Sequence, residues 1–150
     1  MKNLHDPSTA AELRGRLGRM QPDAVRQWGR MTPSQALAHT AKGLEMALGD
    51  LRPPRMLIGR VIGRIVRPLA LGDDKPMRPG SPTSPDLVVA DERDFETERL
   101  RLDQLIERFA SGGPDACTTH PHTFFGPLKT SEWAVLMYKH IDHHLRQFGA

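Results

Sequence analysis

Apolar residues recur every three or four positions along most of this chain, and that spacing predicts amphipathic helices. Proline, glycine and capping residues interrupt the pattern and divide it into separate segments. The predicted helices run from Asp6 to Pro22, from Thr32 to about Gly49, over residues 55–71, from Asp91 or Asp94 to Ser111, and from Thr130 or Ser131 to Gly149.

The second of these segments has the clearest beginning. Thr32 is a good N-cap, Pro33 suits the first helical position, and Gln35 completes a capping box three residues after the cap. No strand is predicted, since Leu87-Val88-Val89 is too short and isolated. We therefore expect residues 1–150 to form one all-α domain, a four-helix bundle with a short amphipathic helix and a proline-rich loop between its second and third core helices.

The segment 55–71 is unusual because arginines alternate with its apolar residues. We expect its apolar side to pack on the bundle, and Pro68 to end or kink the helix. A contact between two copies of the chain is favoured over a role at a membrane surface. The loop that follows is expected to be extended or mobile because it is rich in proline, with Pro76, Pro79, Pro82 and Pro85.

Composition narrows the classes of protein to which this chain can belong. Its 150 residues, of which 38% are hydrophobic, suffice for a real core, and no apolar run is long enough to span a membrane. The polar N-terminus lacks the apolar core of a signal peptide, and the single cysteine, Cys117, excludes an internal disulfide, so a cytoplasmic location is expected. The net charge of +3 is spread out and aromatic residues are few, so no nucleic-acid partner is expected.

The last segment carries two histidines one helical turn apart, His140 and His144. At about 100° per residue, they share an apolar stripe with Trp133, Leu136, Met137 and Phe148. The opposite side is assigned to Lys139, Asp142 and Arg146. Two imidazoles that face the same interior make a pair of metal ligands, because buried polar groups need partners.

A divalent metal needs a third protein ligand, and His39 is the best candidate because no other internal helix carries a histidine. His39 lies roughly 160° from Leu37, away from the leucine stripe of its helix. Between these two directions runs a seam of small residues that permits close helix approach: Ala36, Thr40, Gly43 and Ala47. Two interpretations stay open here, three converging ligands or ordinary core and surface histidines.

Further residues are candidates for a pocket around such a site. His143 lies about 80° from the apolar stripe and is placed at the surface or behind the ligands. A long loop holds His120, His122 and the pair Phe124-Phe125. Long loops in small domains are often functional. This loop either covers the open end of the bundle and lines a pocket for a small molecule, or carries solvated histidines.

Three stretches, residues 27–39, 124–128 and 140–149, together resemble an uncharacterised branch of the DinB/YfiT-like superfamily. They contain a histidine on the second helix and the pair His140-Ile141-Asp142-His143-His144 on the last. The resemblance implies a bundle of up-down-down-up topology that binds zinc or nickel through three histidines, which by position are His39, His140 and His144. Some members of that superfamily act with low-molecular-weight thiols.

The function expected from these observations is metal-dependent. The resemblance implies a thiol S-transferase or a hydrolase of unassigned substrate, with a divalent metal and a low-molecular-weight thiol as cofactors and no assigned catalytic residue. Whether the protein is an enzyme stays open. The alternative is a non-enzymatic bundle with a vestigial metal site that acts through a partner, a second copy of the chain or a membrane surface.

Overall fold

The computed structural model describes residues 1–81 and 83–150, and over these residues the chain is all-helical. Its five α-helices are α1 (Pro7–Arg19), α2 (Pro33–Leu48), α3 (Leu57–Leu71), α4 (Phe95–Gly112) and α5 (Thr130–Gln147). Two 3-10 helices, Pro85–Leu87 and Gly113–Ala116, and an isolated bridge between His122 and Gly126 complete the described structure. Within this part of the chain, no helix is both long and apolar enough to cross a bilayer.

The helices begin where the sequence places capping residues. The Asp6 carboxylate accepts a hydrogen bond from the backbone N–H of Ser8, and the side chains of Thr32 and Gln35 form the expected reciprocal capping box of α2. Asp94, one of the two predicted caps, begins α4. These local signals confirm the predicted starts of α1, α2 and α4.

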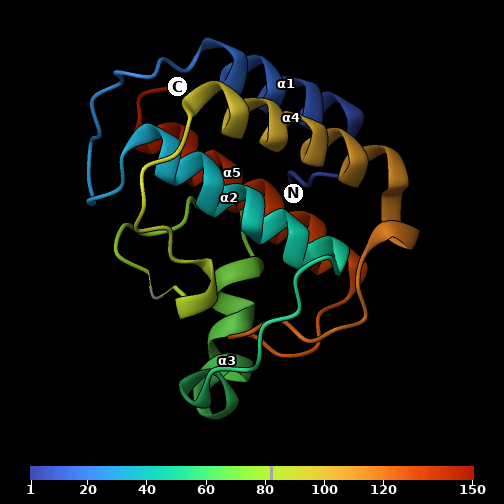
Figure 1. Ribbon diagram of the computed structural model, residues 1–150. Helices are drawn as coiled ribbons and strands as arrows, with labels where there is room; N and C mark the ends of the chain where they lie inside the picture. Colours follow the sequence, from blue (N-terminus) through green and yellow to red (C-terminus); the bar gives the residue numbers. More distant parts are fainter. Residues whose placement is uncertain (82) are drawn as a thin grey trace.

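Four of the helices, α1, α2, α4 and α5, pack together around the core, as Figure 1 shows. α2 contacts both α4 and α5, and α1 contacts the same two helices from the other side. The largest fully buried side chains, Trp133 and Phe109, come from α5 and α4. α2 and α5 are therefore covered on more than one side, which gives them few solvent-facing positions.

Two polar residues of α5 correct the expectation that its Lys139–Arg146 side faces solvent. Lys139 is 4% exposed and Asp142 is 7% exposed, while Arg146 is exposed as expected. Asp142 accepts a hydrogen bond from the Arg16 guanidinium of α1 at 2.7 Å, and Lys139 donates to the carbonyl of Ala70 at 2.7 Å. Burial of these charges is tolerated because each has a bonded partner.

α3 corrects a second expectation, because most of its large apolar side chains do not pack on the bundle, although Leu71 is buried in the core and Val66 packs against it. Five of them are 52–79% exposed, namely Leu57, Ile58, Val61, Ile65 and Leu69. The helix instead packs through Gly59 and Gly63, both buried, against the backbone of Phe124. It also continues past Pro68 to Leu71, so the proline does not end the helix, the first of the two expected outcomes.

The proline-rich loop after α3 lies against α2 and α5. Within the loop, Pro76, Pro79 and Pro85 are described, whereas Pro82 lies outside the described residues. The loop is attached at several points: the carbonyl of Met77 bonds to His143, and that of Val88 to Lys42 of α2. These attachments make the loop one wall of the cavity described next.

Candidate metal centre

The structure brings His39, His140 and His144 together between α2 and α5. One ligand atom from each side chain lies within 4.8 Å of the others, and the Nε2 atoms of His39 and His140 are 2.9 Å apart. The three ring centroids are 4.8–4.9 Å apart in each pairing, and the rings meet edge to face. Residues 101 positions apart in the sequence thus form one cluster.

Gly43 explains how α2 approaches this closely. A Cβ atom at this position would lie 2.8 Å from Nδ1 of His140, so a larger residue would displace that imidazole. The structure also explains how His39 can be buried although it lies on a different side of α2 from Leu37. His39 and Leu37 are 4% and 3% exposed, since α4 covers one side of α2 and α5 another.

Hydrogen bonds at Nδ1 fix the orientation of two of the rings. The Nδ1–H of His39 donates to the carbonyl of Leu87 at 2.9 Å, and the Nδ1–H of His144 donates to Oε1 of Gln147 at 2.9 Å. Gln147 can only accept through this oxygen, because its amide nitrogen donates to the carbonyl of Trp28. Both imidazoles therefore carry an unprotonated Nε2, which in His39 lies within hydrogen-bond distance of Nε2 of His140, 2.9 Å away. An unprotonated Nε2 on a ring held at Nδ1 is the arrangement that supports a metal-bound histidine.

Burial keeps these imidazoles neutral. Desolvation, with a smaller contribution from neighbouring imidazoles, lowers the pKa of His144 to about 3 and the pKa of His140 well below its usual 6.5. Desolvation likewise lowers the pKa of His39. Neutral imidazole is the form that binds metals.

The donor set and its spacing fit a divalent transition metal. Tetrahedral zinc with Zn–N bonds of about 2.0–2.1 Å holds its nitrogen ligands roughly 3.3 Å apart, close to the 2.9 Å between His39 and His140. Three imidazoles suit zinc, nickel, copper or iron and leave positions for water or another ligand.

The cluster opens into a cavity of about 730 Å³, a size that holds a small molecule. His143 lines it, as predicted for a residue beside the ligands: its Nδ1–H donates to Met77, and its ring lies 5.0 Å from that of His144. Phe124 and Phe125 also line the cavity.

The two loop histidines have different roles. His122 lines the cavity, and its Nδ1 accepts hydrogen bonds from the backbone N–H groups of Phe124 and Phe125, both at 3.1 Å. Its burial lowers its pKa to about 4. His120 is not part of the cavity wall and donates through Nε2 to the carbonyl of Pro53 at 3.2 Å, so it shapes the loop instead.

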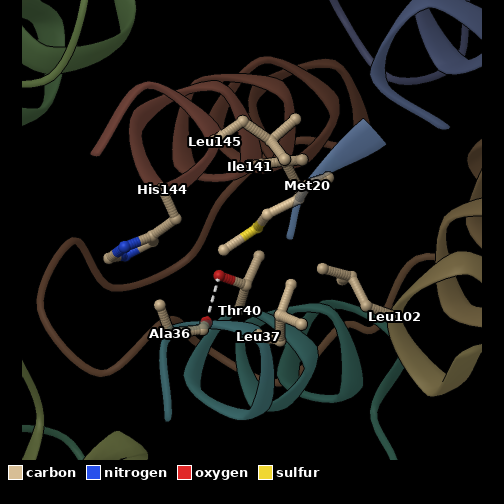
Figure 2. Close-up of a pocket in the computed structure, with 8 residues that line it drawn as sticks. All are labelled: Met20, Ala36, Leu37, Thr40, Leu102, Ile141, His144 and Leu145. Carbon is tan, nitrogen blue, oxygen red and sulfur yellow. Dashed lines mark hydrogen bonds between the residues drawn. The ribbon is translucent and has the colours of Figure 1, made fainter. Parts of the chain in front are cut away.

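A second, much smaller pocket lies on the other side of His144. It encloses about 10 Å³, space for about one water molecule. Figure 2 shows the His144 ring turned away from the other side chains there, while Thr40 donates to the carbonyl of Ala36 at 2.7 Å. The pocket is lined by Met20, Ala36, Leu37, Thr40, Leu102, Ile141, His144 and Leu145. Room for a ligand therefore exists only on the large-cavity side of His144, as far as the described residues show.

Several residues of the site were missed by the sequence interpretation. Gln147 was detectable, because it follows His144 by three positions and so lies on the same helix face. The carbonyl of Leu87 and the Trp28 side chain carry no local signal, since they arrive from distant loops.

The fold and the site define an all-helical protein in which three histidines, largely buried, lie at the wall of a cavity of small-molecule size. The chain belongs to the family described as protein of unknown function (DUF1569), whose family model matches residues 3–150. Neither a curated protein nor a solved structure matched the chain.

Proposed function

We propose that this protein binds one divalent metal ion, zinc or nickel, through His39, His140 and His144. The observation that carries the proposal is the convergence of three neutral imidazoles, two of which are held at Nδ1 so that their Nε2 is unprotonated.

We further propose that the family is a branch of the DinB/YfiT-like superfamily, with α1, α2, α4 and α5 as an up-down-down-up bundle and α3 as an insertion. The packing of these four helices and the placement of the histidines on α2 and α5 support this assignment. A low-molecular-weight thiol is the substrate or co-substrate, in an S-transfer or hydrolysis reaction.

The bound ion would supply Lewis acidity that lowers the pKa of a thiol or water in the cavity. The residues of the chain supply the rest. His143 has its Nδ1–H held by Met77, so its Nε2 is available to accept a proton. Phe124 and Phe125 provide an apolar wall.

The cavity is also suited to an anionic molecule. Arg30, Lys75 and Arg78 line it, and its acidic lining residue Asp73 already bonds to Lys139. The indole N–H of Trp28 is buried without a partner among the described residues, and it lies in the cavity wall. These groups would recognise the carboxylates that low-molecular-weight thiols carry.

The test is metal content, measured by elemental mass spectrometry on untagged protein purified without chelators or nickel resin. We expect near-stoichiometric metal in the parent and its loss in His140→Ala/His144→Ala. His120→Ala is the matched control, because His120 lies outside the cavity, and it should keep the metal.

Circular dichroism of each variant separates loss of the site from loss of the fold. Equal metal content in the parent and the folded double variant would contradict the proposal, as would a folded parent that neither contains metal nor takes it up from solution. The thiol is tested next, by calorimetric titration of cysteine-containing thiols into metal-loaded and metal-free protein. Binding of equal strength to both forms would contradict the metal-activated thiol.

A further inference from the structure

α3 presents a continuous apolar face to solvent. Leu57, Val61, Ile65 and Leu69 are 68–79% exposed, and Ile58 is 52% exposed. Their spacing of three or four residues places all five on one side of the helix. Single exposed aliphatic residues are normal on a protein surface, but a stripe of five along one helix marks a surface that contacts something apolar.

The docking of α3 explains why this face stays free. Gly59 and Gly63, one turn apart, lie on the opposite side of the helix and contact the backbone of Phe124 directly. A Cβ atom at Gly59 would come within 2.5 Å of the Phe124 carbonyl oxygen. The helix is thus held by its glycine side and by Leu71 at its end, and the five exposed aliphatic side chains point away from the protein.

The charged residues of the segment that carries this face are all basic, and one of its arginines, Arg67, is paired with Glu132 of α5 at 2.8 Å. The segment from Leu51 to Gly72 contains five arginines and no acidic residue. Arg60 and Arg64 are exposed next to the apolar stripe and form no ion pair with the described residues. The next acidic residues, Asp73 and Asp74, already accept hydrogen bonds from Lys139 and from the backbone of Lys2. The face therefore attracts a partner that is apolar and anionic.

Two copies of this chain do not meet that requirement through a two-fold contact. Such a contact would place the face against an identical face, and the same segment of each copy would bring further arginines to it. An anionic phospholipid surface supplies both components, since acyl chains accept the aliphatic side chains and headgroups pair with the guanidinium groups.

The position of α3 permits this contact. In Figure 1, α3 stands apart from α1 and α4, at the opposite side of the molecule, and it projects beyond the four packed helices. A flat surface can therefore reach α3 without meeting the bundle. We propose that α3 is a membrane-surface anchor that lies in the headgroup region of an anionic bilayer, independently of metal binding at the histidines.

The test is flotation of the full chain with vesicles of phosphatidylcholine alone and of phosphatidylcholine mixed with phosphatidylserine, at low and high salt. We expect binding only to the phosphatidylserine vesicles and release by salt. Val61→Asp/Ile65→Asp should abolish flotation. Val25→Asp/Leu100→Asp is the matched control, because those two residues are also exposed but lie outside α3, and it should float like the parent.

Replacing two arginines by glutamine measures the electrostatic contribution to vesicle binding. Arg60→Gln/Arg64→Gln should weaken vesicle binding roughly 25-fold, at about fivefold for each charge removed near an anionic surface. The proposal is overturned if the parent fails to float with anionic vesicles at low salt, or if the control variant loses binding as the α3 variant does. Light scattering is run on the same samples. A parent dimer that Val61→Asp/Ile65→Asp converts to monomer, without vesicle binding by the parent, would assign the face to a second copy instead.

Discussion

At the scale of single residues, the histidine cluster depends on side chains that are not themselves ligands. Gln147 links His144 to the backbone of Trp28, because its amide accepts from one and donates to the other. The carbonyl of Leu87 holds His39 by accepting a hydrogen bond from its Nδ1–H. Such partners hold a ligand in one ring orientation and one tautomer.

Replacing Gln147 should therefore weaken metal binding. We expect Gln147→Leu to lower zinc affinity about 10- to 100-fold, because His144 loses the acceptor that keeps its proton on Nδ1. Gln147→Glu keeps an acceptor at the same place and should retain most of the affinity. Competition with a chromophoric chelator measures both, and equal losses in the two variants would show that Gln147 has only a packing role.

Gly43 supports a second prediction. In Gly43→Ala, the new Cβ would lie 2.8 Å from Nδ1 of His140 and would push the imidazole out of the cluster. Zinc affinity should fall by at least about tenfold, although alanine is the better helix former. Gly18→Ala in α1 is the control, because nothing lies within 4 Å of that Cβ. That control should gain up to about 1 kcal/mol of stability and bind metal normally.

The convergence of the three histidines could be predicted from the sequence, but the long-range hydrogen bonds around them could not. Spacing alone placed His140 and His144 on one helix face, and the small seam around Gly43 indicated where another helix approaches. The carbonyl of Leu87, which accepts from His39, and the carbonyl of Trp28, which accepts from Gln147, are far from these residues in sequence. No local pattern predicts such long-range bonds.

At the scale of helices, α3 shows what a periodic pattern leaves undecided. The period correctly predicted a helix over this segment, but it does not state which face contacts the protein. Here the glycine face packs and the aliphatic face does not. By contrast, the starts of α1, α2 and α4 were predictable, because a cap acts within its own turn.

Adding a methyl group to the packed face of α3 should detach it. Gly59→Ala or Gly63→Ala forces a Cβ against the carbonyl of Phe124, at a cost of about 1–3 kcal/mol in the free energy of unfolding. Trypsin should also cleave faster after Arg60 and Arg64 as the helix loosens. Urea unfolding and timed proteolysis check this, and parent-like behaviour in both assays would contradict the docking described here.

At the scale of the whole molecule, four imidazoles that are buried or half-buried should make the metal-free protein sensitive to acid. Their pKa values are lowered by desolvation, to about 3 for His144 and about 4 for His122, with His39 and His140 also lowered. In the unfolded chain they regain an ordinary pKa of 6.5. The unfolded state therefore binds more protons below that pH, and stability falls as the pH decreases.

The size of this effect follows from the proton linkage. When the pH is lowered from 7 to roughly 5, each imidazole that stays neutral in the folded protein should lower the free energy of unfolding by about 2 kcal/mol. Urea unfolding at the two pH values measures the sum, and His122→Asn should reduce the pH dependence by removing one such group. A free energy of unfolding that does not change over this interval would contradict the burial of these side chains.

The two tryptophans lie beside histidines of the cavity region. The ring of Trp28 lies 5.3 Å from that of His143, and the ring of Trp133 lies 5.4 Å from that of His122. The chain contains no other tryptophan. Its tryptophan fluorescence therefore comes only from indoles next to these imidazoles, and a quencher or a ligand that enters the cavity would change this emission without any added label. The two tryptophans thus serve as built-in fluorescent probes of ligand binding in the cavity.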